Sequence, residues 1–319
     1  MKGPFGGPFF MMSRIQYILS GIVLSIGFLT GGFNNQLSIT VCLILILIFG
    51  IPHGAVDHRI HFSVTKSDNL FHFIVKYLAI AGGYVLLWLL VPAIALMFFL
   101  FMSAYHFGQE LLEDNKIKGS MILALLGGLF IVFGPLLYHY DESKEFLNTI
   151  APNVFPVLTE SLHQVLAFVL LITFTVSIIL ALVTNAINWT KTWKLLVFTG
   201  IITCFNLFLS LLPAFTAYFI LFHSLNAFKH QYQWLKKKND SYNFGRFMTD
   251  LVGFSLLAIL GILMLLWVLK PDGISELVSY FFILTSIITL PHAITLDHFY
   301  RSKNRIEQDR FNSALNTFS

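Results

Sequence analysis

Four histidines lie within long apolar stretches of the sequence, where an ionisable side chain is costly to place: His53, His106, His223 and His292. Neutral imidazole is a common protein ligand for iron, zinc and copper. Four imidazoles from separate segments can surround one ion, so a metal centre is the leading interpretation. A hydrogen bond between neighbouring helices is the plain alternative for any one of them. A proton relay in a transporter is another functional use, although such relays normally recruit buried carboxylates.

Three further polar side chains follow these histidines closely. Asp57 comes four residues after His53, which places both on one face of a continuous helix. A carboxylate in that position fixes the tautomer of a ligand histidine and raises its basicity. Glu110 and Asn226 follow the second and third histidines by about one turn. We therefore predict that these three side chains lie behind the ligands and orient them.

The first and last histidines lie in similar nine-residue segments, GIPHGAVDH (50–58) and LPHAITLDH (290–298). In both, a proline precedes the histidine. A proline inside a helix frees a carbonyl and bends the axis, which is tolerated where a neighbouring helix or a cavity satisfies that carbonyl. In the second segment the aspartate follows the histidine by five residues, which places it about 140° around a helix. Two matches of this length are weak evidence for an internal duplication, and coincidence is the other interpretation.

The composition indicates the solvent in which these segments fold. Of 319 residues, 56% are hydrophobic and 11% are charged, against about 25% charged in a soluble domain. A globular core of this size cannot bury so much apolar surface. We predict an all-α polytopic membrane bundle that forms a single integral membrane domain over residues 1–319. A soluble enzyme, a disordered chain and a disulfide-stapled secreted module are excluded, and we expect no nucleic-acid partner.

A transmembrane helix needs about 20 apolar residues, and about ten stretches of the sequence qualify. They lie at about 15–32, 37–55, 71–91, 92–111, 119–140, 160–184, 193–212, 213–235, 247–269 and 275–299. Pro92 and Pro213 mark two connections so short that the flanking spans must form tight hairpins. The four histidines fall on the second, fourth, eighth and tenth spans. All four spans run from outside to inside and carry their histidine in the inner half.

The basic residues predict the orientation of these spans. If the N-terminus is inside, the inner loops contain Arg59, Lys66, Lys116, Lys118, Lys191, Lys194, Lys236, Lys237, Lys238 and Arg246. The tail, about 301–319, adds four more basic residues, whereas the outer connections hold few. This positive-inside pattern predicts a multi-pass protein of the cell inner membrane with both termini in the cytoplasm.

The segments GIPHGAVDH, YHFGQE, FHS and LPHAITLDH, in this order on separate spans, resemble the Brp/Blh family of bacterial and archaeal β-carotene dioxygenases. The resemblance extends roughly from His53 to His298. It implies an all-helical membrane enzyme with histidine-bound Fe²⁺. Such an enzyme splits the central 15,15′ double bond of β-carotene with O₂ into two molecules of all-trans-retinal. It implies as partners β-carotene, O₂ and membrane lipid, with the retinal passed to a microbial rhodopsin.

The iron ligands that the resemblance implies are not all present. The family's iron histidines fall on His53, His106 and His223, but the fourth, four residues after the third, falls on Ala227. We expect His292 to complete the ligand set, with Asn226 or water as the alternatives. Glu110 is the nearest candidate for the family's acidic residue after the second histidine.

Two other functions compete with carotenoid cleavage. A membrane di-iron hydroxylase or desaturase uses HxxxH and HxxHH boxes, and this sequence contains neither. A transporter for metal ions or protons is the second rival, although the spans show no convincing inverted repeat. The 34 phenylalanines and 11 tyrosines can line a tunnel for a carotenoid, but most aromatic side chains of membrane helices face lipid or core. Nucleotide-binding fingerprints and a CxxCH haem motif are absent from the sequence.

Overall fold

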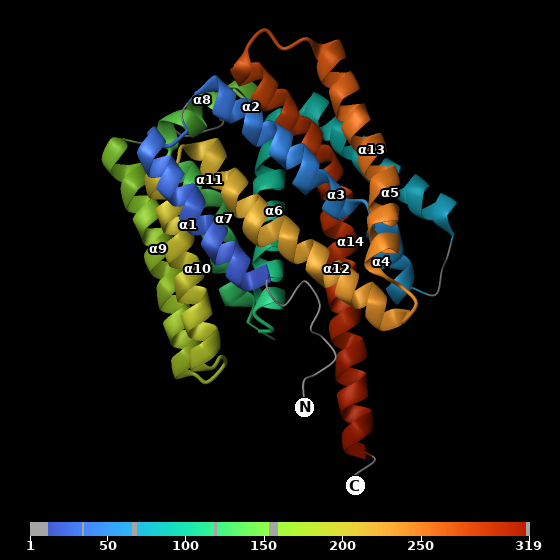
Figure 1. The fold of residues 1–319 in the computed structure, drawn as a ribbon. Coiled ribbons are helices and arrows are strands. Elements are labelled where there is room, and N and C mark those ends of the chain that lie inside the picture. The colour runs from blue at the N-terminus through green and yellow to red at the C-terminus, as the bar shows by residue number, and fades with distance from the viewer. Residues whose placement is uncertain (1–11, 34, 66–68, 118–119, 153–158, 317–319) are drawn as a thin grey trace.

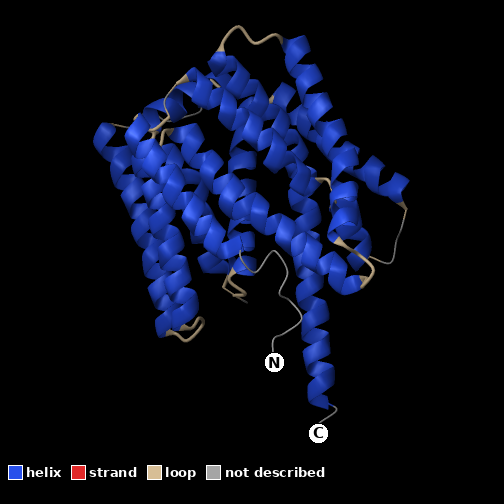
Figure 2. Cartoon of the chain, viewed as in Figure 1, coloured by secondary structure: helices blue, strands red, loops and turns tan. Residues whose placement is uncertain are grey.

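A computed structural model describes residues 12–33, 35–65, 69–117, 120–152 and 159–316, with the backbone alone for 12, 13, 160 and 307–316. Across these residues the regular elements are all helical, and short loops connect them (Figure 2). The predicted all-α bundle is therefore confirmed. The predicted basic residues Lys66 and Lys118 lie outside the described residues.

Short helices precede and follow the long ones (Figure 1). The elements are α1 Met12–Thr30, α2 Gln36–Leu45, η2 Ile46–Gly50, α3 Ile51–Gly54, α4 Asp57–Val64, α5 Leu70–Leu90, α6 Pro92–Asp114, α7 Met121–Tyr138, α8 Tyr140–Ile150, α9 Glu160–Val183, α10 Trp189–Phe208, α11 Leu211–Tyr218, η3 Phe219–Ser224, α12 Leu225–Lys238, α13 Phe244–Leu269 and α14 Ile274–Asn316. Both η2 and η3 are π-helical, and each joins its neighbours without a loop.

Eight of the helical segments described are long and apolar enough to cross a membrane. They correspond to eight of the ten predicted spans. The other two predicted spans are α1, whose apolar part is shorter, and α10, whose hydropathy is lowered by Lys191, Lys194 and Asn206. The polytopic bundle is confirmed, but the count of ten is reduced to eight by these criteria.

The two predicted hairpins are present. Helix α5 ends at Leu90 and α6 begins at Pro92, as expected for a residue without an N–H. The break between α10 and α11 lies at Leu209 and Ser210, before Pro213. Ser210 donates both its backbone N–H and its hydroxyl to Gly32 O at 2.9 Å, which fixes this turn against the end of α1.

The polar stretch 141–159 contains a helix that the sequence reasoning did not predict. Helix α8 buries Tyr140, Ser143, Leu147 and Ile150 and exposes its acidic side chains. It packs against α14 and α7 at the end of the bundle opposite the C-terminal part of α14 (Figure 1).

The spans differ in how much of their surface the protein covers. Within the apolar stretch, 56% of residues are buried in α6, in α7 and in α11–α12, but only 11% in α5 and 17% in α9 and α13. The covered spans form the centre of the bundle, and the others present apolar side chains at its periphery. All four predicted ligand histidines lie on spans that are at least 39% buried, so the cluster is central rather than lipid-facing.

Helices α6 and α7 approach each other so closely that only glycine fits. A Cβ on Gly108 would lie 2.0 Å from Ala124 O, and one on Gly128 would lie 1.7 Å from Ala104 O. The two backbones are therefore in contact over two turns. This packing holds α6 in one position along the centre of the bundle.

Helix α14 continues without a break through Pro291 to Asn316. The predicted tail is thus the extension of the last span, and it projects beyond the other helices (Figure 1). The loops after α9 and α12 lie toward the same end, as the predicted inner loops should (Figure 1).

Candidate metal centre

Two of the four histidines are presented by irregular backbone. His223 lies inside η3, and His53 lies in α3, immediately after η2. In both segments the backbone N–H at the end of the π turn bonds five residues back, Leu225 to Ile220 O and Ile51 to Ile46 O. Single π turns inside helices occur often at functional sites because they re-aim the following side chains. The sequence reasoning predicted neither segment.

The four histidines converge in the centre of the bundle. Their side chains are buried, with relative exposures of 6% for His53, 1% for His106, 2% for His223 and 3% for His292. The His53 ring lies 4.7 Å, centroid to centroid, from both His223 and His292. The His106 ring lies 5.5 Å from each of the same two rings. Four helices therefore bring four imidazoles together, as the sequence predicted.

Two carboxylates lie behind this cluster and orient two of its rings. Glu110 Oε2 is hydrogen-bonded to His223 Nδ1. Asp57 places both carboxylate oxygens 2.9 Å from His292 Nδ1. When Nδ1 carries the proton and donates to the carboxylate, Nε2 of the same ring is free to bind a metal.

The partner of Asp57 differs from the one that its spacing predicts. We expected Asp57 to lie behind His53, but it bonds to His292 of α14 instead. The i,i+4 relation holds only in a continuous helix. Here the helix is interrupted at Ala55 and Val56, and Asp57 begins the new helix α4. The interruption turns the carboxylate away from His53 and toward the neighbouring helix.

Asn226 also lies elsewhere than predicted. Its amide donates to Asp114 Oδ2 at 2.6 Å, and its oxygen accepts from Gln16 Nε2 at 2.8 Å. It therefore faces α1 and the end of α6 rather than the ring of His223. His230 contacts the same carboxylate, with Nε2 3.2 Å from Asp114 Oδ1, and lies outside the histidine cluster.

The donor atoms of the cluster fit a metal ion. Among the residues described, both ring nitrogens of His106 and Nε2 of His292 lack a hydrogen-bond partner although they are buried. Such unpaired groups are costly unless another ligand satisfies them. The Nε2 atoms of His53 and His223 lie 3.1 Å apart, close enough for both to bond one ion at about 2.1 Å.

In the described part of the chain, one group of buried donor atoms lies close enough together to hold a metal ion. It consists of His106, Glu110 and His223, whose ligand atoms lie within 4.8 Å of one another. This buried group can bind a metal. His53 and His292 adjoin it through the ring contacts above, and buried Ala227 stands one turn beyond His223 without offering a ligand atom.

Several residues that support the cluster were missed in the sequence. Phe219 stacks on His223 at 4.9 Å and Phe107 packs edge-on against it at 4.8 Å. The Tyr77 hydroxyl lies 3.4 Å from Asp57 Oδ2. Two buried glutamines, Gln16 and Gln231, bond to the backbone beside His223 and His53. A lone amide in an apolar helix was the available signal for Gln16.

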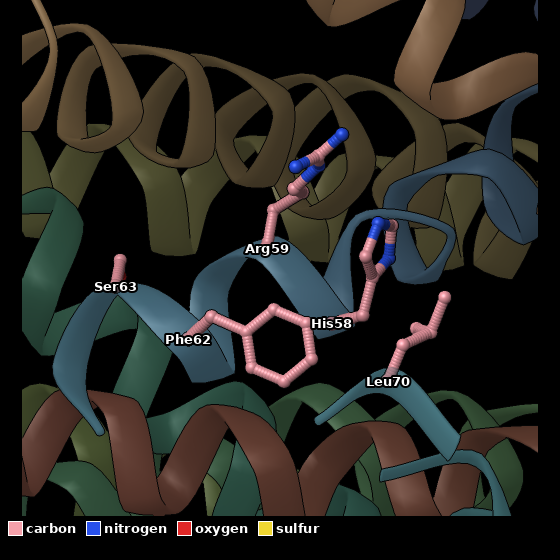
Figure 3. Close-up of a pocket in the computed structure, with 5 residues that line it drawn as sticks. All are labelled: His58, Arg59, Phe62, Ser63 and Leu70. Carbon is pink, nitrogen blue, oxygen red and sulfur yellow. The ribbon is translucent and has the colours of Figure 1, made fainter. Parts of the chain in front are cut away.

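A pocket of about 450 Å³ lies elsewhere, along α4 and the start of α5. Its lining side chains, His58, Arg59, Phe62, Ser63 and Leu70, point in different directions (Figure 3). None of the four cluster histidines lines it. We assign no role in the metal centre to this pocket.

The sequence is similar to proteins of a known family. The profile of the β-carotene 15,15′-dioxygenase family matches residues 44–300, most of the chain. The chain belongs to this family. A similar protein is the β-carotene 15,15′-dioxygenase of an uncultured marine bacterium, 66A03, with 33% identity over 138 residues. That alignment covers 41% of this chain and 46% of the relative, so it spans about half of the relative's length.

The match to the β-carotene 15,15′-dioxygenase family includes the whole histidine cluster, because all four histidines, Glu110 and Asp57 lie within residues 44–300. Helix α1 lies outside the match. No solved structure matches this chain significantly. The arrangement of the cluster therefore comes from the present structure alone.

Proposed function

We propose that this membrane protein is a β-carotene 15,15′-dioxygenase that holds one Fe²⁺ with His53, His106, His223 and His292. The observation that carries the proposal is the convergence of four buried imidazoles from four helices, two of them backed by carboxylates. Ferrous iron, when bound, supplies the redox chemistry by which O₂ reacts with the polyene.

The charges of the site suit a divalent ion. Four neutral imidazoles would hold the ion without adding charge, and a set of four protein ligands would leave room for O₂. Glu110 and Asp57 contribute two negative charges immediately behind the ligands, which balance the charge of Fe²⁺. Their hydrogen bonds hold His223 and His292 in the tautomer that presents Nε2.

The surroundings of the cluster suit an apolar substrate. Phe107 and Phe219 pack on His223, and the histidines themselves are at most 6% exposed, so water is excluded from the centre. β-Carotene is an uncharged polyene that partitions into the bilayer, and a bundle with eight apolar spans can take it laterally from lipid. Cleavage of the central 15,15′ double bond yields two all-trans-retinal molecules, which a microbial rhodopsin can take up.

The same proposal places the protein in the cell inner membrane with both termini in the cytoplasm. The basic residues of the predicted inner loops support this orientation. In that orientation the C-terminal part of α14 extends into the cytoplasm.

Expression in bacteria that accumulate β-carotene tests the activity. We expect the cells to lose their colour and to contain retinal, measured by chromatography, whereas cells with His53→Ala keep their colour. Persistent colour with well-folded, iron-loaded wild-type protein would overturn the proposal. Metal analysis should find one iron per chain, and two would favour a di-iron hydroxylase. Proteoliposome flux of metal ions or protons without carotenoid turnover would favour a transporter.

A further inference from the structure

Gln16 of α1 reaches across to the π-helical segment that carries His223. Its side chain is 5% exposed, and its Nε2 donates to Leu221 O at 2.7 Å and to Asn226 Oδ1 at 2.8 Å. Both N–H hydrogens of the Gln16 amide are therefore donated to residues close to His223 in the sequence. This bond joins residues 205 positions apart in the sequence.

In a regular α-helix the Leu221 carbonyl would not need a side-chain donor. In an α-helix the N–H of Leu225 would bond to Leu221 O, four residues back. Here the N–H of Leu225 bonds to Ile220 O, five residues back. The Leu221 carbonyl loses its α-helical donor, and a buried carbonyl left without one is costly. Gln16 supplies a donor at this position.

Gln231 of α12 acts in the same way on the segment that carries His53. Its side chain is 2% exposed, and its Nε2 donates to His53 O at 2.8 Å. That carbonyl lies just before the interruption of the helix at Ala55 and Val56, where Ala55 N–H bonds only three residues back, to Pro52 O. The side chain of Gln231 thus supplies a donor where the helical ladder is broken.

We propose that Gln16 and Gln231 are positioning residues of the metal centre: each holds the irregular backbone turn that aims one histidine, His223 or His53, at the shared ion. This inference rests on the proposed function, since it assigns the two amides a role in metal binding. The two segments contact each other directly, and the Nε2 atoms of the two histidines lie 3.1 Å apart. A small shift of either turn therefore changes that separation. Gln16 also gives α1, outside the family match, a part in the site.

The test replaces each glutamine with methionine, which is similar in length but has no N–H donor. The probe is Co²⁺ added to the purified full-length protein after its metal has been removed in detergent. Gln16→Met and Gln231→Met should each bind Co²⁺ about 10–100-fold more weakly, as expected for residues behind metal ligands. Both should also shift the visible absorption of bound Co²⁺, which reports ligand geometry. Gln233→Met is the matched control, because Gln233 is exposed on the same helix as Gln231.

The outcomes separate this inference from the function on which it rests. Variants that elute and melt like the wild type, and bind Co²⁺ with wild-type affinity and absorption, would overturn the positioning role alone. A wild type that binds neither Co²⁺ nor Fe²⁺ would overturn the proposed function and this inference with it. If Gln231→Met fails to fold, Gln231→Asn takes its place. It keeps the amide but is one methylene too short to reach His53 O, so the same weakening is expected.

Discussion

The two proline–histidine segments have similar sequences and different backbones. In 50–58 a π turn precedes the proline, and the helix is interrupted directly after Gly54. In 290–298 the helix α14 continues through Pro291 without interruption. Both histidines nevertheless reach the same cluster, with ring centroids 4.7 Å apart. Two segments of similar sequence thus place a histidine at the same site although their backbone conformations differ.

Two glycines, Gly50 and Gly54, allow the first segment to adopt its irregular, closely packed backbone. A Cβ on Gly50 would lie 2.5 Å from the ring of Phe219, and one on Gly54 would lie 3.3 Å from His292 Nδ1. The first segment therefore lies so close to η3 and α14 that a larger residue would have to displace the neighbouring side chains. In the second segment the residues at the same distances from the histidine are Thr289 and Ala293, and both carry a Cβ.

The aspartates of the two segments have separate roles for the same reason. Asp57 turns inward to His292 because it begins a new helix after the break. Asp297 follows its histidine by five residues on an unbroken helix and bonds instead to Tyr105, Gln109 and Arg301. Only the first aspartate belongs to the histidine cluster.

The largest effects should come from the histidines that follow the prolines. His53→Ala and His292→Ala should each abolish retinal formation and remove most of the bound iron, because no neighbouring side chain on the same helix can replace a ligand. Iron per chain and retinal yield measure the effect. His58→Ala and His298→Ala remove the last histidine of each segment and should change both by less than about threefold. Full iron retention in His53→Ala would show that the ligand set is wrong.

The next largest difference in iron affinity or rate is expected between substitutions of the two aspartates. Asp57→Asn keeps the shape but removes the charge behind His292, and it should lower iron affinity or rate by roughly 10–100-fold. Asp297→Asn should change either by less than about threefold, since its partner Arg301 is exposed and such pairs contribute little. Equal losses in the two variants would contradict the separate roles inferred here.

A smaller loss is expected from filling the space at Gly54. Gly54→Ala places a methyl group 3.3 Å from His292 Nδ1, so the ring must shift by a few tenths of an ångström. We expect roughly tenfold weaker iron binding from this misplacement. As a control on the other segment, Ile294→Ala removes an exposed side chain two residues after His292 and should leave iron affinity unchanged. Iron titration of both purified variants makes the comparison.

The last comparison is a partial rescue. Ala227→His places an imidazole one turn beyond His223, and two histidines at this spacing can share one metal. In the His292→Ala background it should strengthen iron binding by roughly tenfold over His292→Ala alone. In the wild type it should give no gain, because His292 already fills the fourth place. A clear gain in the wild type would instead show that the ligand set is incomplete without it.

Much of the fold could be predicted because membrane helices are specified locally. About 20 apolar residues define a span whatever its neighbours are, and Pro92 stopped a helix where its missing N–H requires. Helix α10 forms where a span was predicted, but its polar side chains give it a lower hydropathy than the other spans. The short amphipathic helix α8, which fills a polar stretch, was not predicted. The convergence of the four histidines also followed from local information, since the direction and depth of each span place its histidine at one level.

The contacts behind the histidines required the tertiary structure. Asp57 and Asn226 were assigned to their sequence neighbours, but their partners are His292, Asp114 and Gln16, on other helices. Residue types and spacing determine which helices form and which side chains can bind a metal. Which carboxylate meets which imidazole depends on π turns and helix breaks. Two side chains distant in the sequence, Gln16 and Gln231, donate to carbonyls in these irregular turns.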